Sequence, residues 1–401
     1  MTISVARKAL YALGGLLRGV LGIAMWAAGI PLCAITLPRA GAPFTAMALT
    51  AILIAVAVWL HEGGHYLGAR IMRMRVLRVS ATFVDIVPQR LGFRWRLHRP
   101  REHKLAGIVC AVPAPNQPMR PAFLVFAAGG PVANLLAAAL VAVVAWLFWP
   151  SPPAGILLAF AAINTAMGLL NLVPHSTGHV SDGQQLLSWA RGIDEYSAEL
   201  ASTRLLSLSV HGTTADALPP ADLAELERQP LPAPLQALWF RTKAAQNRGD
   251  WDGTPALIEA TEAQIQMLTR AQQTCLRPLI EHLRGELAFS EAMRLRDASP
   301  LRDPALPLDV AWLAPELCPR VEALRAALRG DMASCERALE DARRYAENEV
   351  DAASAPSEAR IATALRERFG AAPLLPATSP QSAALQHRVR EIEPEPRQPI
   401  A

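Results

Sequence analysis

Residues 121–181 read PAFLVFAAGGPVANLLAAALVAVVAWLFWPSPPAGILLAFAAINTAMGLLNLVPHSTGHVS and contain no Lys, Arg, Asp or Glu. The earlier stretches 19–37 and 40–60 are equally free of charge. A run of roughly 20 apolar residues is long enough to cross a bilayer. The 401-residue chain is 52% hydrophobic and 18% charged, whereas soluble domains average about 25% charged residues. The sequence therefore predicts a mainly α-helical, polytopic membrane protein with about four spans, at 19–37, 40–69, 121–149 and 154–174.

The net charge divides the chain into two parts. Residues 1–190 carry 15 Lys or Arg against four acidic residues, a net charge of +11, whereas residues 191–401 carry a net charge of −7. The positive charge flanks the apolar stretches, as it does at the cytoplasmic ends of membrane helices. A nucleic-acid-binding protein would instead gather its basic residues on a polar domain, so we expect no nucleic-acid partner. The charge pattern places both termini in the cytoplasm.

Four segments follow from these patterns. Residues 1–18 form a basic amphipathic N-terminal segment at the membrane surface, and residues 19–190 form the transmembrane core. Residues 191–370 form a cytoplasmic helical domain, and the Pro-rich residues 371–401 are expected to be a disordered tail.

The connection between the second and third spans has the pattern of a small sheet. Phe93, Trp95 and Leu97 alternate with Arg94 and Arg96, which is typical of a half-buried strand. The runs 76–84 and 105–112 are also strand-like. We expect a β-like cytoplasmic segment at 73–118, associated with the membrane, with its basic face toward anionic headgroups. The alternative is a basic loop that only sets the topology.

The C-terminal half contains two similar segments, AAQNRGDWDGTPALIEA at 244–260 and AALRGDMASCERALEDA at 326–342. Each has small residues, then Gly-Asp, then Ala and Leu at helical spacing. This resembles the helix–turn–helix units of tetratricopeptide-like repeats, with 282–298 as a degraded third copy. An ordinary helical bundle is the alternative.

The second span contains His61-Glu62-Gly63-Gly64-His65, an H-E-x-x-H motif. Residues four apart share one face of a helix, so the two imidazoles can bind one cation. Glu62 lies beside them and can accept a proton from a water molecule at that ion. Ionisable side chains inside a bilayer are costly and tend to mark function. The five cysteines are scattered and show no C-x-x-C, so we expect no thiolate metal site.

A zinc site needs a third protein ligand and an open position. Asp182, the next carboxylate after the uncharged stretch, is placed just past the fourth span, on the side where the second span carries its motif. His175 and His179 are rival third ligands.

These residues resemble the site-2 protease family of intramembrane zinc metalloproteases. That family pairs an H-E-x-x-H on one span with an N-x-x-P … D-G motif on a later one, and here the later motif comprises Asn171, Pro174, Asp182 and Gly183. Between them, Gly130-Pro131-Val132-Ala133-Asn134 looks like the family's G-P-x-x-N element. The resemblance covers about residues 40–190. The gap between N-x-x-P and D-G is slightly longer than in many relatives, with residues 176–178 as the insertion.

The resemblance implies that His61, His65 and Asp182 bind Zn²⁺ and that Glu62 is the general base. It also implies that Asn134 and Asn171 lie near the substrate backbone or the oxyanion. We therefore expect an intramembrane endopeptidase of a bacterial cytoplasmic membrane that cleaves transmembrane segments of membrane proteins in regulated intramembrane proteolysis. Its partners would be the membrane-protein substrate, the lipid bilayer and a protein that binds the C-terminal helical domain.

Three other functions stay open. The chain could be a membrane-anchored zinc protease acting on soluble peptides, with a distant Glu as third ligand. It could be a non-catalytic scaffold whose C-terminal domain binds partners. A transporter is the least compatible with a single charged cluster.

Overall fold

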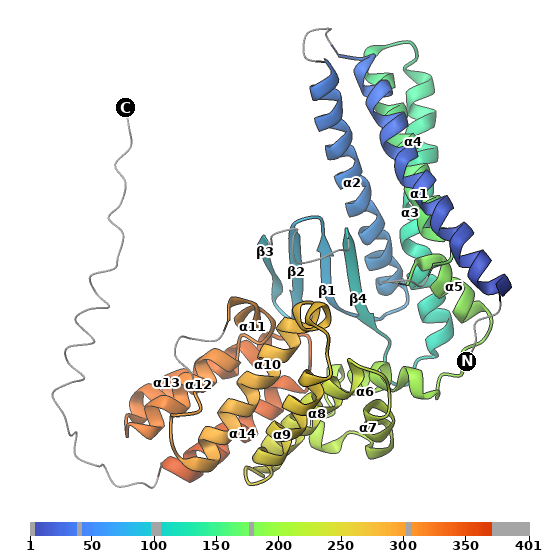
Figure 1. Cartoon of the computed structure of the whole chain (residues 1–401). Helices are drawn as coiled ribbons and strands as arrows, with labels where there is room; N and C mark the ends of the chain where they lie inside the picture. Colours follow the sequence, from blue (N-terminus) through green and yellow to red (C-terminus); the bar gives the residue numbers. More distant parts are fainter. Residues whose placement is uncertain (1–4, 38–41, 98–105, 176–179, 302–306, 371–401) are drawn as a thin grey trace, which may run out of the picture.

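The computed structural model describes residues 5–37, 42–97, 106–175, 180–301 and 307–370. Four long helices form an elongated bundle (Figure 1). These helices are α1 (Val5–Ala34), α2 (Ala42–Ile71), α3 (Met119–Leu147) and α4 (Pro152–Leu172). Each contains a stretch that is long and apolar enough to cross a membrane, at Gly14–Ala34, Pro43–Ile71, Met119–Leu147 and Pro152–Leu172. The four predicted spans are confirmed, and the chain is an integral membrane protein.

The sequence predicted a boundary at residue 18 between a surface segment and the first span, but helix α1 continues through this residue. It begins at Val5 and ends at Ala34, so the basic N-terminal segment is the first part of a spanning helix and not a separate one. The Arg18 guanidinium donates to the Leu170 carbonyl at 3.2 Å. This contact ties the start of the first span to the last turn of α4.

Glycines allow α2 and α3 to cross at very short distance. A Cβ on Gly64 would overlap the Gly129 carbonyl, and a Cβ on Gly129 would overlap the Gly64 carbonyl. One turn further along, a Cβ on Gly68 would lie 2.8 Å from the Val125 carbonyl oxygen. Small residues are the usual means by which membrane helices pack closely. The crossing brings the H-E-x-x-H segment of α2 against the middle of α3.

A four-stranded antiparallel sheet follows α2 directly, in the order β3-β2-β1-β4. The strands are β1 (Arg75–Ala81), β2 (Val84–Gln89), β3 (Gly92–Leu97) and β4 (Gly107–Val112). In the register, Val79 faces Ile86 of β2 on one side and Val109 of β4 on the other. The strands lie beside the final part of α2 (Figure 1). Ala81, at the end of β1, packs in one apolar cluster with Ala57 of α2, one helical turn before His61.

The sheet confirms three of the expected strand-like runs and adds one strand that the sequence did not reveal. Strands β3 and β4 lie within the predicted segments, and β1 ends in a turn before the predicted run at 76–84 is complete. Strand β2 was missed because its sequence, VDIVPQ, contains an acid and a proline and does not alternate. The alternative of a basic loop that only sets the topology is excluded for the described part of 73–118.

The expectation that the basic face of the sheet meets lipid headgroups was wrong. Arg78 and Arg96 both bond to the fully buried Asp85, through contacts of 2.6 and 3.4 Å. The guanidinium groups of Arg94 and Arg96 stack on the Trp312 ring, with their central carbons 4.7 and 5.0 Å from its centroid. Trp312 belongs to the C-terminal helices, which therefore cover the face that was expected to be open.

The C-terminal part consists of helices that lie beyond the sheet and the end of the bundle (Figure 1). After α5 (Asp182–Ala190) the α-helices are α6 (Ala201–Val210), α7 (Pro220–Glu227), α8 (Ala233–Arg248), α9 (Thr254–Gln266), α10 (Arg270–Leu295), α11 (Leu308–Leu313), α12 (Leu317–Leu328), α13 (Met332–Asn348) and α14 (Ser354–Phe369). The predicted tail, 371–401, lies outside the described residues.

The two similar segments of the C-terminal half fold alike. Each is a helix, a turn and a helix, formed by α8–α9 and by α12–α13. In both turns the glycine, Gly249 or Gly330, has a positive φ, of 69° and 75°. The proposed third copy at 282–298 does not fold this way, because Gly285 is buried in the interior of the continuous helix α10.

Candidate metal centre

The H-E-x-x-H segment lies on helix α2, inside the second span. His61 and His65 are 6% exposed and Glu62 is 5% exposed. Because the two histidines are one turn apart, their rings lie on the same face, with centroids 4.8 Å apart and ring planes nearly perpendicular. The helix therefore presents two imidazoles to one point between α2, α3 and the start of α5.

Asp182 reaches this point because the chain after α4 folds back on itself. The His175 and Ser181 backbones close the intervening loop: the Ser181 amide donates to the His175 carbonyl at 2.9 Å. Ser181 then caps α5, its hydroxyl accepting from the Gln184 amide at 3.2 Å, and Asp182 is the first residue of that helix. A Cβ on Gly183 would overlap the Leu172 carbonyl, so the glycine of the D-G pair allows α5 to start directly against the end of α4.

The longer gap between the two halves of this motif does not displace Asp182. The described residues on either side of the gap are joined by the His175–Ser181 pair, which holds Ser181 and therefore Asp182 close to the end of α4. The inserted residues 176–178 and the rival ligand His179 lie outside the described residues. His175 is half-buried and is not a member of the metal-binding group.

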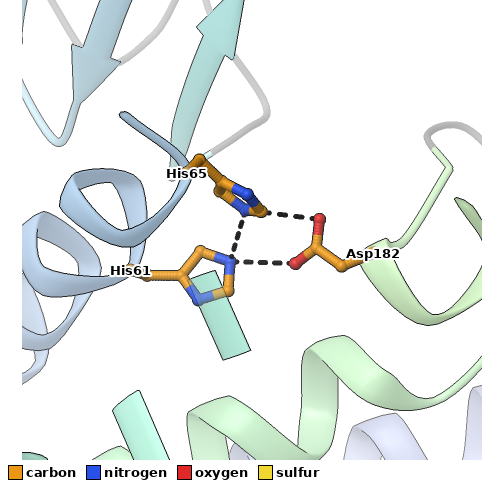
Figure 2. A group of neighbouring side chains, drawn as sticks. All are labelled: His61, His65 and Asp182. Atoms are coloured by element: carbon orange, nitrogen blue, oxygen red, sulfur yellow. Dashed lines mark hydrogen bonds and ion pairs between the residues drawn. The ribbon is translucent and has the colours of Figure 1, made fainter. Parts of the chain in front are cut away.

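Three side chains converge on one focus (Figure 2). His61 Nε2 lies 3.0 Å from Asp182 Oδ2 and 3.2 Å from His65 Nε2, and His65 Nε2 lies 3.3 Å from Asp182 Oδ1. Ligands about 2.0–2.1 Å from a tetrahedral zinc ion are about 3.3 Å from one another. Among the described residues this is the one group of three or more His, Cys, Asp or Glu side chains with that convergence.

The hydrogen bonds of the outer ring nitrogens favour the tautomer that can bind a cation. His65 Nδ1 lies 2.8 Å from the Phe126 carbonyl, and His61 Nδ1 lies 2.6 Å from Asn134 Oδ1. Both partners are acceptors, so each Nδ1 carries the hydrogen, and each neutral ring turns the lone pair of Nε2 toward the focus. Two lone pairs and a carboxylate facing one another are unfavourable unless a positive ion lies between them. The donor set, two nitrogens and an oxygen, suits a metal such as zinc.

The pKa of Asp182 is lowered by the same two histidines. Burial raises the pKa of a carboxyl group, but when the imidazoles are protonated their Nε2 hydrogens and positive charge outweigh burial and lower the pKa of Asp182 to about 2. Asp182 is therefore ionised at neutral pH and available as an anionic ligand.

Glu62 lies on the same helix and is covered by the sheet. A Cβ on Gly107, the first residue of β4, would overlap the Glu62 carboxylate. The Thr82 amide, just after β1, donates to the Ala106 carbonyl, just before β4, at 2.7 Å. This hydrogen bond holds the start of β4 beside the end of β1. Strand β4 thus begins directly against the carboxylate. Nothing in the sequence around Gly107 signals this contact, because the two residues are 45 positions apart.

The two asparagines differ in position. Asn134 is fully buried, and besides accepting from His61 it donates to the Ala57 carbonyl at 3.0 Å and to Asn164 Oδ1 at 2.7 Å. In the described structure its polar atoms thus bond to His61 and to the two neighbouring helices α2 and α4. Asn171 is half-buried and donates to the Met167 carbonyl of its own helix at 3.1 Å. Sequence reasoning missed Asn164, although a buried asparagine in a span is itself a signal.

Gly130 offers a test of how closely α3 packs against the imidazoles. A Cβ at this position would lie 2.5 Å from His65 Nε2 and 2.7 Å from His61 Nε2. Gly130→Ala is therefore expected to displace both rings and to weaken metal binding by more than about tenfold, the scale on which ligand orientation acts. Metal titration of the purified variant measures this.

Gly63→Ala is the matched control, because it lies inside the motif itself. A Cβ there meets no described atom within 4 Å, and alanine favours a helix more than glycine does. We expect its metal affinity to equal that of the original protein. Equal loss in both variants would contradict the packing described here.

Comparison with known proteins agrees with this site. The sequence model of peptidase family M50, the site-2 protease family, matches residues 49–154. The matched region contains the H-E-x-x-H segment and Asn134, and Asp182 follows it. No curated protein and no solved structure gives a significant match to the chain. With four candidate spans and a convergent His61, His65 and Asp182 group, the chain has the features of a membrane metallopeptidase, and its residues 49–154 are similar to peptidase family M50.

Proposed function

We propose that the protein is a zinc-dependent intramembrane endopeptidase that cleaves transmembrane segments of other membrane proteins. The observation that carries the proposal is the depth of the site. His61 and His65 lie inside the span Pro43–Ile71, and Glu62 precedes Arg70 by eight residues, about 12 Å of helix. A metallopeptidase with its ligands at that depth acts on a bond that lies below the membrane surface.

In this proposal His61, His65 and Asp182 hold the ion, and Glu62 is the general base. A bound zinc ion supplies Lewis acidity, which lowers the pKa of a water molecule and polarises the scissile carbonyl. Glu62 accepts the proton from the attacking water at its carboxylate and later donates it to the leaving amide nitrogen. Gly107 covers one side of the buried Glu62 carboxylate.

The asparagines have separate roles in the proposal. Asn134 acts through His61, because its hydrogen bond to Nδ1 fixes the tautomer that leaves Nε2 free. Asn171, half-buried in the last turn of α4, is proposed to contact the substrate backbone. A substrate must unwind locally before its carbonyl can be attacked. Because β4 is an edge strand that starts against Glu62, an extended substrate that pairs with this edge would lead to the base.

The topology that we propose has both termini in the cytoplasm of a bacterial cell. Arg70, at the end of α2, and Arg120, at the start of α3, lie at the end of the bundle that faces the C-terminal helices (Figure 1). Basic residues gather on the cytoplasmic side of membrane proteins. The site then lies in the cytoplasmic half of the membrane, where water can reach it.

We further propose that the C-terminal helices form a tetratricopeptide-like module that binds a protein partner and takes part in regulated intramembrane proteolysis. The support is the repeated turn: Asp250 donates from its amide to the Ala245 carbonyl, and Asp331 does the same to the Ala326 carbonyl, both at 2.9 Å. Units of this kind stack to form binding surfaces.

The test of the proposed function is where the protein cuts. The purified protein would be reconstituted in vesicles with a single-span substrate, and the fragments would be mapped by mass spectrometry. We expect cleavage inside the apolar segment, and inhibition by a metal chelator. The same apolar segment presented as a soluble peptide is the comparison. Cleavage confined to soluble peptides, or to bonds outside the membrane segment, would contradict the proposal.

A further inference from the structure

The C-terminal helices enclose a polar cavity far along the chain from the metal centre. Its volume is about 180 Å³, and helices α8, α10 and α14 contribute to its walls. Five carboxylates but one lysine, Lys243, line it. The carboxylates belong to Glu286, Glu316, Glu349, Asp351 and Glu358.

Two of these carboxylates are neutralised by the protein. Arg320, which is fully buried behind the cavity, lies 2.6 Å from Glu286 Oε2 and donates from Nε to Glu358 Oε2 at 3.0 Å. Lys243 Nζ lies 3.2 Å from the other oxygen of Glu286. Glu286 and Glu358 therefore belong to a structural ion-pair network and have little capacity left for a ligand.

The other three carboxylates are less well paired. Glu316 is 7% exposed, its Oε2 has no hydrogen-bond partner among the described residues, and the nearest guanidinium nitrogen, of Arg320, is 3.9 Å from Oε1. Glu349 accepts from the Ser354 hydroxyl and Asp351 from the Ser209 hydroxyl, at 2.9 and 3.0 Å. Within the part of the chain that the structure describes, neither has a cationic side chain in ion-pair distance.

The pKa values of Glu349 and Asp351 are both raised. Burial, reinforced by the nearby negative charge of Glu316, raises the pKa of Glu349 well above its ordinary value. Burial likewise raises the pKa of Asp351. Buried carboxylates of this kind are costly to ionise without a cation. Arg94 and Lys243 act on Glu349 and Asp351 only from a distance, and His282 of the lining lies beside Glu286. The cavity thus holds more carboxylates than the surrounding cations pair closely, so an external cation would complete its charge.

The chemistry of the cavity favours an organic cation over a metal ion. No three of these carboxylates converge as closely as the ligands of the metal centre do, among the described residues. Trp239, Phe240 and Leu313 give the cavity an apolar wall, and the Trp239 indole nitrogen is buried without a partner among the described residues. A short aliphatic chain can lie along this wall while charged ends reach separate carboxylates.

We propose that this cavity binds a small aliphatic diamine, with ammonium groups at Glu316 and at the Glu349–Asp351 pair. The site adjoins the contact between the C-terminal helices and the membrane-associated sheet. Glu349 forms an isolated β-bridge with Gln89 of β2, and Leu313 follows Trp312, which stacks with the arginines of β3. Glu349 would therefore contact both the bound diamine and the sheet that covers Glu62.

The test is direct binding to the full-length protein in detergent. Calorimetric titration with 1,4-diaminobutane is expected to show saturable binding at one site per chain, and 1,4-butanediol, its neutral counterpart, is expected not to bind. Glu316→Gln and Glu349→Gln keep the shape of each side chain and are each expected to weaken binding by about tenfold or more, or about 1.4 kcal/mol. Glu367→Gln, which removes an exposed charge from α14, is the matched control and should bind normally.

Three results would overturn the proposal: no saturable binding of the diamine, equal binding of the diol, or unchanged affinity in both cavity variants. Displacement of the diamine by Mg²⁺ at equal concentration would also overturn it, in favour of a metal site. Glu62→Gln protein is expected to bind the diamine as the original protein does. Failure of the proposed protease activity is therefore distinguishable from failure of this site.

Discussion

Replacing Glu62 by Gln is expected to abolish cleavage of a membrane-anchored substrate, lowering the rate by about 10²–10⁴-fold, the usual contribution of a general base. Gln has the same shape as Glu but cannot accept the proton. Because Glu62 is not one of the three converging ligands, the metal content of the variant is expected to equal that of the original protein. Single-turnover cleavage in vesicles and elemental analysis of the same sample measure both quantities.

The matched control for this change is Glu199→Gln, which removes one exposed carboxylate outside the spans. It is expected to cleave at the original rate. Activity of the Glu62 variant within a few-fold of this control would show that another group accepts the proton. Loss of metal together with loss of activity would show that Glu62 is a ligand and not the base.

Asp182→Ala is expected to have the second largest effect, on metal binding itself. It removes the only oxygen ligand of the group that converges in the described structure and leaves two imidazoles. We expect zinc affinity to fall by more than about 100-fold, the upper end of what loss of a supporting partner alone costs. Competition with a zinc-binding dye measures the affinity, and cleavage is expected to fall in parallel.

Asp194→Ala is the control for this substitution, because it removes an exposed carboxylate shortly after α5. Its zinc affinity is expected to be unchanged. Retained affinity and activity in the Asp182 variant would mean that a different side chain, such as His175 or a distant Glu, completes the site. That result would favour the membrane-anchored protease of soluble peptides.

The spans and the central motif were predictable because local sequence decides them. A bilayer leaves an apolar segment such as residues 121–147 only the helix as a way to satisfy its backbone. Once α2 is helical, the spacing of His61 and His65 puts both rings on one face. The strand at Gly92–Leu97 was predictable for a similar reason, since its alternation of apolar and basic residues has the period of a strand.

The surroundings of the site were not predictable, because they depend on contacts between distant parts of the chain. Gly107 meets Glu62 only after the sheet turns back along α2. Arg96 faces Asp309, 213 residues away, at 2.7 Å, so its charge is neutralised by a partner that no local pattern reveals. Asn134 belongs to the G-P-x-x-N element, which suggested substrate binding. The packing of α2, α3 and α4 buries its side chain completely.

The most direct test of the central claim is X-ray absorption at the zinc edge of the purified, zinc-loaded protein. We expect the zinc ion to be surrounded by nitrogen and oxygen atoms at about 2.0–2.1 Å, with the scattering of two imidazoles and no sulfur. A zinc–sulfur distance of about 2.3 Å, or the signal of three imidazoles, would contradict the assignment of His61, His65 and Asp182 as the ligands.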